Sequence, residues 1–95
     1  DGRDLDWMTH VNPVRDDRAM IVVFNPTGTK RSRRIRAPLR RAGLNGRVRL
    51  DSAVGPAREP EWERMQALDA RGRLAIEVSV PPGGMRWIRV RAARD

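Results

Sequence analysis

The 95-residue chain contains no cysteine and no tyrosine, a single phenylalanine and a single histidine. The lack of cysteine excludes disulfide bonds and thiolate metal sites, and it leaves the redox compartment open. A nucleophile–histidine–acid site would have to use His10, and no serine or threonine stands at a spacing that favours such a site. The sequence therefore predicts no catalytic residue, no metal site and no cofactor.

Long apolar runs are lacking as well. None approaches the ~20 residues that a membrane-spanning helix needs, so we expect no membrane partner, and no signal peptide is recognisable. No long amphipathic helical pattern separates the extended segments, which argues against a parallel α/β fold. A chain of this length forms one domain, here residues 1–95, with a small core. Because the first residue is Asp1 and not an initiator methionine, we expect a fragment or a processed piece of a larger protein.

Lysine is nearly absent: of 20 basic residues only Lys30 is a lysine, and the formal net charge is +8. A basic chain raises nucleic acid or another anion as a partner. The densest basic cluster lies between residues 30 and 41, and if the strands on either side of residue 43 pair, arginines of both share one surface. The candidate anion patch comprises Arg34, Arg36, Arg47 and Arg49. Since no aromatic residue interrupts the cluster, base stacking is not supported and nucleic acid is a poor candidate.

The chain does contain a continuous apolar run, Ala19–Phe24, that leads into a turn of Asn, Pro, Thr and Gly. β-Branched and aromatic residues favour extended backbone, and we expect Asn25 and Thr27 to cap the turn through side-chain hydrogen bonds. Since both faces of this strand are apolar, it is predicted to be a central strand covered on both sides, with another domain on the second face. The predicted domain interface comprises Ile21, Val23, Trp87 and Trp7.

Seven short strands with turn signals between them predict an antiparallel β-sandwich, Greek-key-like, in an all-β chain whose residues 1–4 are mobile. They span Trp7–Val11, Ala19–Phe24, Ser32–Leu39, Arg47–Ser52, Met65–Leu68, Arg73–Val80 and Met85–Ala92. The first two strands form a hairpin around residues 12–18. Residues 69–72 are predicted as a hairpin turn, 81–84 as a tight connection in the last hairpin, and 53–60 as a loop. The fifth strand is ambiguous, because Trp62, Met65 and Leu68 also allow a helical turn.

The tryptophans offer a second functional interpretation. Exposed indole rings on a sandwich can stack on sugar faces, so Trp62 and Trp87 are the candidate residues of a carbohydrate-binding module. The alternative is that Trp7 and Trp87 fill the core or contact a neighbouring domain. Strict alternation places Ile88 and Val90 inward and Trp87 outward.

Three features resemble a known family: the apolar strand that runs into Phe24-Asn25-Pro26-Thr27, the next strand ending in Ala37-Pro38-Leu39, and the last hairpin, Ile76–Val90, with its Pro-Pro-Gly-Gly turn. Together they resemble the C-terminal β-sandwich domain that follows the (β/α)8 barrel in glycoside hydrolases of the α-galactosidase and α-amylase kinds. The resemblance covers most of Leu5–Arg91.

The resemblance implies a noncatalytic accessory domain that packs on the catalytic barrel of the same chain and stabilises it. The catalytic carboxylates would lie on that barrel. An extracellular or secreted parent enzyme fits this family. The arginine load between residues 30 and 41 departs from the usual pattern and leaves nucleic-acid or anion binding as one alternative role. The tryptophans leave carbohydrate binding as the other.

Overall fold

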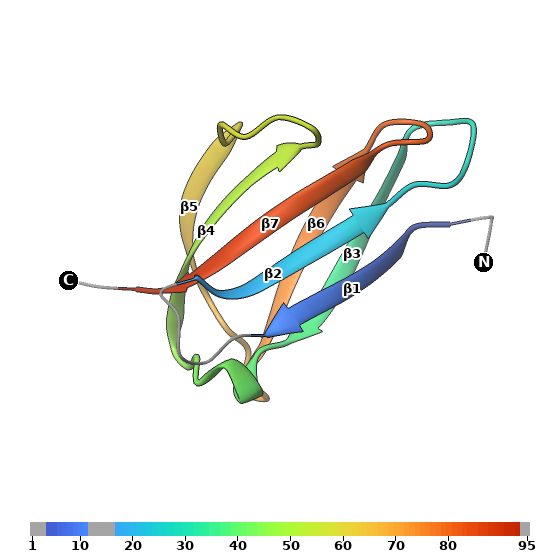
Figure 1. The fold of residues 1–95 in the computed structure, drawn as a ribbon. Coiled ribbons are helices and arrows are strands. Elements are labelled where there is room, and N and C mark those ends of the chain that lie inside the picture. The colour runs from blue at the N-terminus through green and yellow to red at the C-terminus, as the bar shows by residue number, and fades with distance from the viewer. Residues whose placement is uncertain (1–3, 12–16, 94–95) are drawn as a thin grey trace.

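The computed structural model describes residues 4–11 and 17–93, which form seven antiparallel strands in two layers (Figure 1). The strands are β1 (Asp6–Val11), β2 (Asp17–Phe24), β3 (Arg31–Pro38), β4 (Arg47–Val54), β5 (Trp62–Ala67), β6 (Arg73–Val80) and β7 (Met85–Ala92). A short 3-10 helix, Arg40–Ala42, lies between β3 and β4. The predicted all-β sandwich is confirmed, and the ambiguous fifth segment is a strand and not a helical turn.

The larger layer has five strands in the order β1-β2-β7-β4-β5, and the smaller layer pairs β3 with β6. Figure 1 shows β3 and β6 lying behind the larger sheet. β7 returns to lie beside β4, which is the crossover typical of a Greek key. The central strand of the larger sheet is β7 and not β2, because two strands lie on each side of β7.

Two tight connections cross between the layers instead of closing hairpins. Asp69–Gly72 joins β5 to β6, and Pro81–Gly84 joins β6 to β7, and each connection links strands of different sheets. The turns themselves are present: the Gly72 amide donates to the Asp69 carbonyl (2.9 Å), and the Gly84 amide donates to the Pro81 carbonyl (3.0 Å). The two predicted hairpins are wrong, because turn residues reveal a chain reversal but not the sheet that the next strand joins.

The predicted pairing of β1 with β2 is confirmed, and its antiparallel register continues from Asp6↔Phe24 to Val11↔Ala19. Most of the turn predicted for this hairpin, residues 12–16, lies outside the described residues, as do residues 1–3 of the segment predicted to be mobile. Asp4 is described, and its Oδ2 accepts a hydrogen bond from Arg33 Nη1 (3.0 Å).

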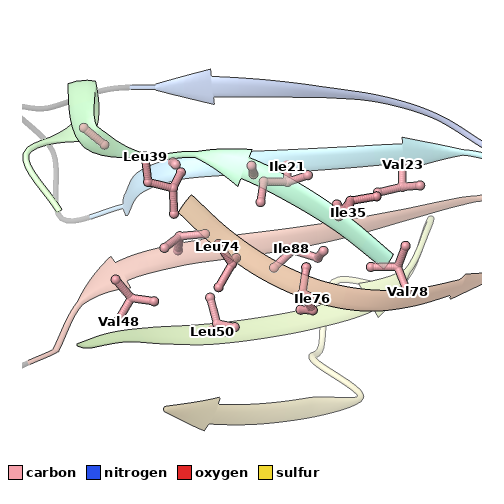
Figure 2. Packing of buried hydrophobic residues seen from close by; sticks show 14 of the residues in the cluster. Ile21, Val23, Ile35, Leu39, Val48, Leu50, Leu74, Ile76, Val78 and Ile88 are labelled. Carbon is pink, nitrogen blue, oxygen red and sulfur yellow. The ribbon is translucent and has the colours of Figure 1, made fainter. Parts of the chain in front are cut away.

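The core fills the space between the layers and is built from alternate residues of the strands (Figure 2). The β3–β6 layer covers the face of β2 that carries Ile21 and Val23, and both side chains are 0% exposed. The prediction that these two residues contact a neighbouring domain is therefore wrong: the contact that buries them is the second layer of the same domain. The opposite face of β2 carries Met20, Val22 and Phe24, and nothing in the described part of the chain covers it.

Asn25 holds the turn after β2. Its carboxamide nitrogen donates to the carbonyls of Thr29 (2.8 Å) and Val80 (2.9 Å), and its Oδ1 accepts from the amide (2.9 Å) and the hydroxyl (2.6 Å) of Thr27. The side chain is nearly fully buried. The predicted capping by Asn25 and Thr27 is confirmed, and the bond to Val80 also ties the turn to the end of β6.

A buried arginine closes one end of the core. Arg86 has the same parity on β7 as Ile88 and points inward, where its Nε donates to the Ser79 carbonyl (2.9 Å) and its Nη1 to the Ser52 hydroxyl (3.1 Å). Its Nη2 donates to Glu61 Oε1 (3.2 Å). The guanidinium thereby links β4, β6 and the segment before β5.

Glu61 makes the stability of this end pH-dependent. The Val54 amide, which donates to Glu61 Oε2 (2.8 Å), and Arg86 lower the pKa of the carboxyl below its ordinary value of 4.5, while desolvation opposes the shift. A lowered folded-state pKa adds stability at pH values above 4.5, and that stability is lost as the pH falls through the lower value.

We therefore expect Glu61→Gln to lower the free energy of unfolding at neutral pH and to reduce the difference in stability between neutral and strongly acidic solution. Urea denaturation at a series of pH values measures both effects. Glu59→Gln, an exposed carboxylate in the same loop, is the control. A pH dependence that is the same for Glu61→Gln and the unmodified chain would contradict the assignment.

Candidate interaction surface

No second layer covers the outer face of the larger sheet in the described part of the chain, and apolar side chains gather there on β1, β2 and β7. The loop after β4 contacts this face at Trp87. Val22 lies in register with Met8 on one side and Trp87 on the other, and Phe24 lies in register with Met85. Because alternate residues of a strand share a face, these side chains project to the same side. The apolar patch comprises Met8, Met20, Val22, Phe24, Met85 and Trp87.

The apolar patch is well exposed. Met8 is 55% and Phe24 41% exposed, and the other members are half-buried. Scattered apolar side chains are normal on a protein surface, but a contiguous cluster marks an interaction site. Met65 on β5 is also 41% exposed, but it lies opposite Arg49 and outside the patch.

A charged band borders the patch on the same face. Asp51 on β4 accepts hydrogen bonds from Arg89 Nε at both carboxylate oxygens (3.1 Å each), and the Arg89 Nη2 also contacts Asp51 Oδ2. A shallow cavity of about 200 Å³ opens beside this pair, with Arg49, Glu63 and Arg91 on its wall. Carboxylates lie among the arginines of this band. The band is therefore not a uniformly positive groove in which an anion would bind.

The candidate anion patch is not assembled by strand pairing. β3, which carries Arg34 and Arg36, pairs with β6, whereas β4, which carries Arg47 and Arg49, pairs with β5 and β7. The condition that these two strands pair is not met, since they belong to different layers. The two pairs of arginines alternate with core residues of both layers and so project from opposite faces of the sandwich.

The three tryptophans do not share a surface. Trp62 is half-buried and packs against the core, and the Arg64 guanidinium carbon lies 4.5 Å from its ring centroid. Trp7 also packs against the core. Trp87 is on the outer face, as alternation predicts, and its Nε1 donates to the Ala57 carbonyl (2.9 Å). The two candidate sugar-stacking residues, Trp62 and Trp87, therefore lie on opposite sides of the larger sheet.

The described residues offer few side chains for catalysis or metal binding. His10 is exposed on β1, and the described ranges hold no group of three or more His, Cys, Asp or Glu side chains that could bind a metal ion. In the same residues, no helix has the length and apolar character needed to cross a membrane.

Comparison with known proteins identifies no relative: no protein-family model, no curated protein and no solved structure matches the chain. The assignment of the site therefore depends on its geometry and on the resemblance described above.

The sequence reasoning missed the apolar patch although its signal was present. Both faces of β2 are apolar in the sequence, and the predicted interface of Ile21 and Val23 leaves the other face for the core. Alternation along the last strand places Met85 on the same side as Trp87, and alternation along the first strand places Met8 opposite Trp7. The missing step was the choice between the two faces of β2.

Proposed function

We propose that the chain is a noncatalytic accessory domain that packs on the catalytic barrel of a glycoside hydrolase and stabilises it. The observation that carries the proposal is the apolar patch, a contiguous exposed surface in a chain of which 34% of the residues are charged. The barrel is proposed as the partner because the strand-and-turn pattern resembles the C-terminal domains of such enzymes. The revised interface consists of Met8, Val22, Phe24 and Trp87 in place of Ile21, Val23 and Trp7.

The contact with a second domain depends on several side chains of the patch together. Complete burial of one large apolar side chain contributes about 1.5–3 kcal/mol. The members of the patch are only partly exposed, so each contributes less than this, and several must act together. An aromatic ring at the centre of a buried interface typically contributes most, which makes Phe24 and Trp87 the residues to test first.

The test uses the complete natural protein that carries this domain, with Phe24→Gln. Loss of an apolar contact with the barrel should lower the midpoint of thermal inactivation of the hydrolase by about 2–4 °C per kcal/mol of lost contact. Met65→Gln is the matched control, because Met65 is also 41% exposed but lies outside the patch.

The isolated domain serves as the reference for folding. Since Phe24 lies on the surface of this domain, Phe24→Gln should change its own free energy of unfolding by no more than about 0.5 kcal/mol. Equal midpoints for Phe24→Gln, Met65→Gln and the unmodified protein would reject the apolar patch as the interface. A natural protein without a barrel domain would reject the proposed function itself.

A further inference from the structure

The edge of the larger sheet at β1 is unusually unprotected. Although 34% of the chain is charged, Trp7-Met8-Thr9-His10-Val11 contains no Asp, Glu, Lys, Arg or Pro. The strand also pairs with β2 in an unbroken register, without a bulge. Charges, prolines and bulges are the usual means by which a sheet edge is kept from pairing with another strand. β1 has none of them along these five residues.

The other edges in the described part of the chain are protected. β3 carries four arginines and ends at Pro38, and β5 has Glu63 and Arg64 near its middle. The β6 edge is capped by side chains: the Ala75 carbonyl accepts from Gln66 Nε2 (2.5 Å), and the Ser79 carbonyl accepts from Arg86 Nε (2.9 Å). Among the described sheet edges, β1 is thus the one that lacks such protection.

We propose that the partner of this edge is a second copy of the chain, paired antiparallel through β1 about a two-fold axis at Met8. In this register Asp6 of one copy lies opposite His10 of the other, and Trp7 lies opposite Thr9. An acid then faces an imidazole, and a large ring faces a small side chain, so neither like charges nor two indoles are opposed. The β1 sequence is therefore self-complementary, as a two-fold interface requires.

The proposed pairing joins two five-stranded sheets into one continuous sheet. A two-fold axis perpendicular to the sheet keeps both outer faces on the same side, so the two apolar patches lie side by side with Met8 of each copy at the joint. The pairing uses the edge of the sheet, whereas the proposed barrel contact uses its outer face, and Met8 is common to both. Each copy carries a net charge of +8, and the mutual repulsion should make the dimer stronger as salt is added.

The test exploits the absence of cysteine from the chain. A residue on the two-fold axis faces its own copy at about 4.5–5.5 Å between Cα atoms, a spacing that a disulfide bridges. In a glutathione redox buffer at physiological salt, Met8→Cys should therefore be recovered mainly as a disulfide-linked dimer. Met65→Cys, an exposed methionine on the charged β5 edge, should remain monomeric. An equimolar mixture of Asp6→Cys and His10→Cys chains should give the mixed dimer in preference to either homodimer.

Sedimentation of the unmodified chain completes the test. We expect a monomer–dimer equilibrium that shifts toward the dimer with protein concentration and with salt, and that Met8→Lys abolishes because it opposes two like charges at the axis. Equal disulfide yields for Met8→Cys and Met65→Cys would overturn the proposal, as would an unmodified chain that stays monomeric at every concentration. Neither result would affect the barrel contact, which Phe24→Gln tests in the complete protein.

Discussion

Replacing Ile21 with alanine should lower the free energy of unfolding by about 4 kcal/mol. Ile21 is fully buried between the two layers, where it belongs to the same cluster as Ile35 and Ile88. Its truncation removes apolar contacts and leaves a cavity that the surrounding strands fill only in part. Met20→Ala, one residue earlier, should cost less than about 1.5 kcal/mol, because Met20 lies half-buried on the outer face.

Urea denaturation of the isolated chain, followed by circular dichroism and tryptophan fluorescence, measures this pair of substitutions. The slope of the free energy against urea concentration should be the same for both variants, so that the shift in midpoint reports stability. Equal losses for Ile21→Ala and Met20→Ala would contradict the placement of Ile21 inside and Met20 outside the sandwich.

The strands were predictable because their signal is local. Alternation of apolar and polar residues identifies Arg73–Val80 and Met85–Ala92 with the bounds that the structure has. The alternation also places Trp87 on the face opposite Ile88. Glycine and proline mark the chain reversals between strands. None of this depends on which strands become neighbours.

Apart from the pairing of β1 with β2, the pairing of strands was not predictable, because it depends on contacts distant in sequence. Nothing local distinguishes a turn that closes a hairpin from the connection between β6 and β7, which enters another sheet. The same gap led to the wrong assignment of the two faces of β2 and left the pairing of β3 with β4 open. Once β3 and β6 are known to cover Ile21 and Val23, the assignment of the faces is corrected and β3 is paired with β6.

The buried position of Arg86 is a feature that the sequence pattern does not predict. Alternation along β7 places it inward with Ile88, but a charged side chain is expected outward unless it has partners. Those partners, Ser52, Ser79 and Glu61, come from separate segments of the chain. Their convergence is a consequence of the topology, so the buried guanidinium could be recognised only in the folded structure.

Replacing Asn25 with leucine should lower the free energy of unfolding by about 3 kcal/mol. The change leaves the Val80 and Thr29 carbonyls without their carboxamide donor and leaves the Thr27 amide without its acceptor. Val80 is fully buried, so water does not readily replace the lost donor there. Urea denaturation provides the measurement, and Asn45→Leu, in the exposed segment before β4, is the matched control.

A second variant separates the lost hydrogen bonds from the change in shape. Asn25→Asp keeps the Oδ1 acceptor for Thr27 but turns an oxygen toward the carbonyls of Val80 and Thr29, which raises the pKa of the new carboxyl above its unfolded value. Its destabilisation should therefore be largest at neutral pH and should decrease as the pH falls through that raised value, where the protonated carboxyl can donate again. If Asn25→Asp is as stable as the unmodified chain at neutral pH, the two donated bonds do not hold the turn, and the loss in Asn25→Leu must come from packing alone.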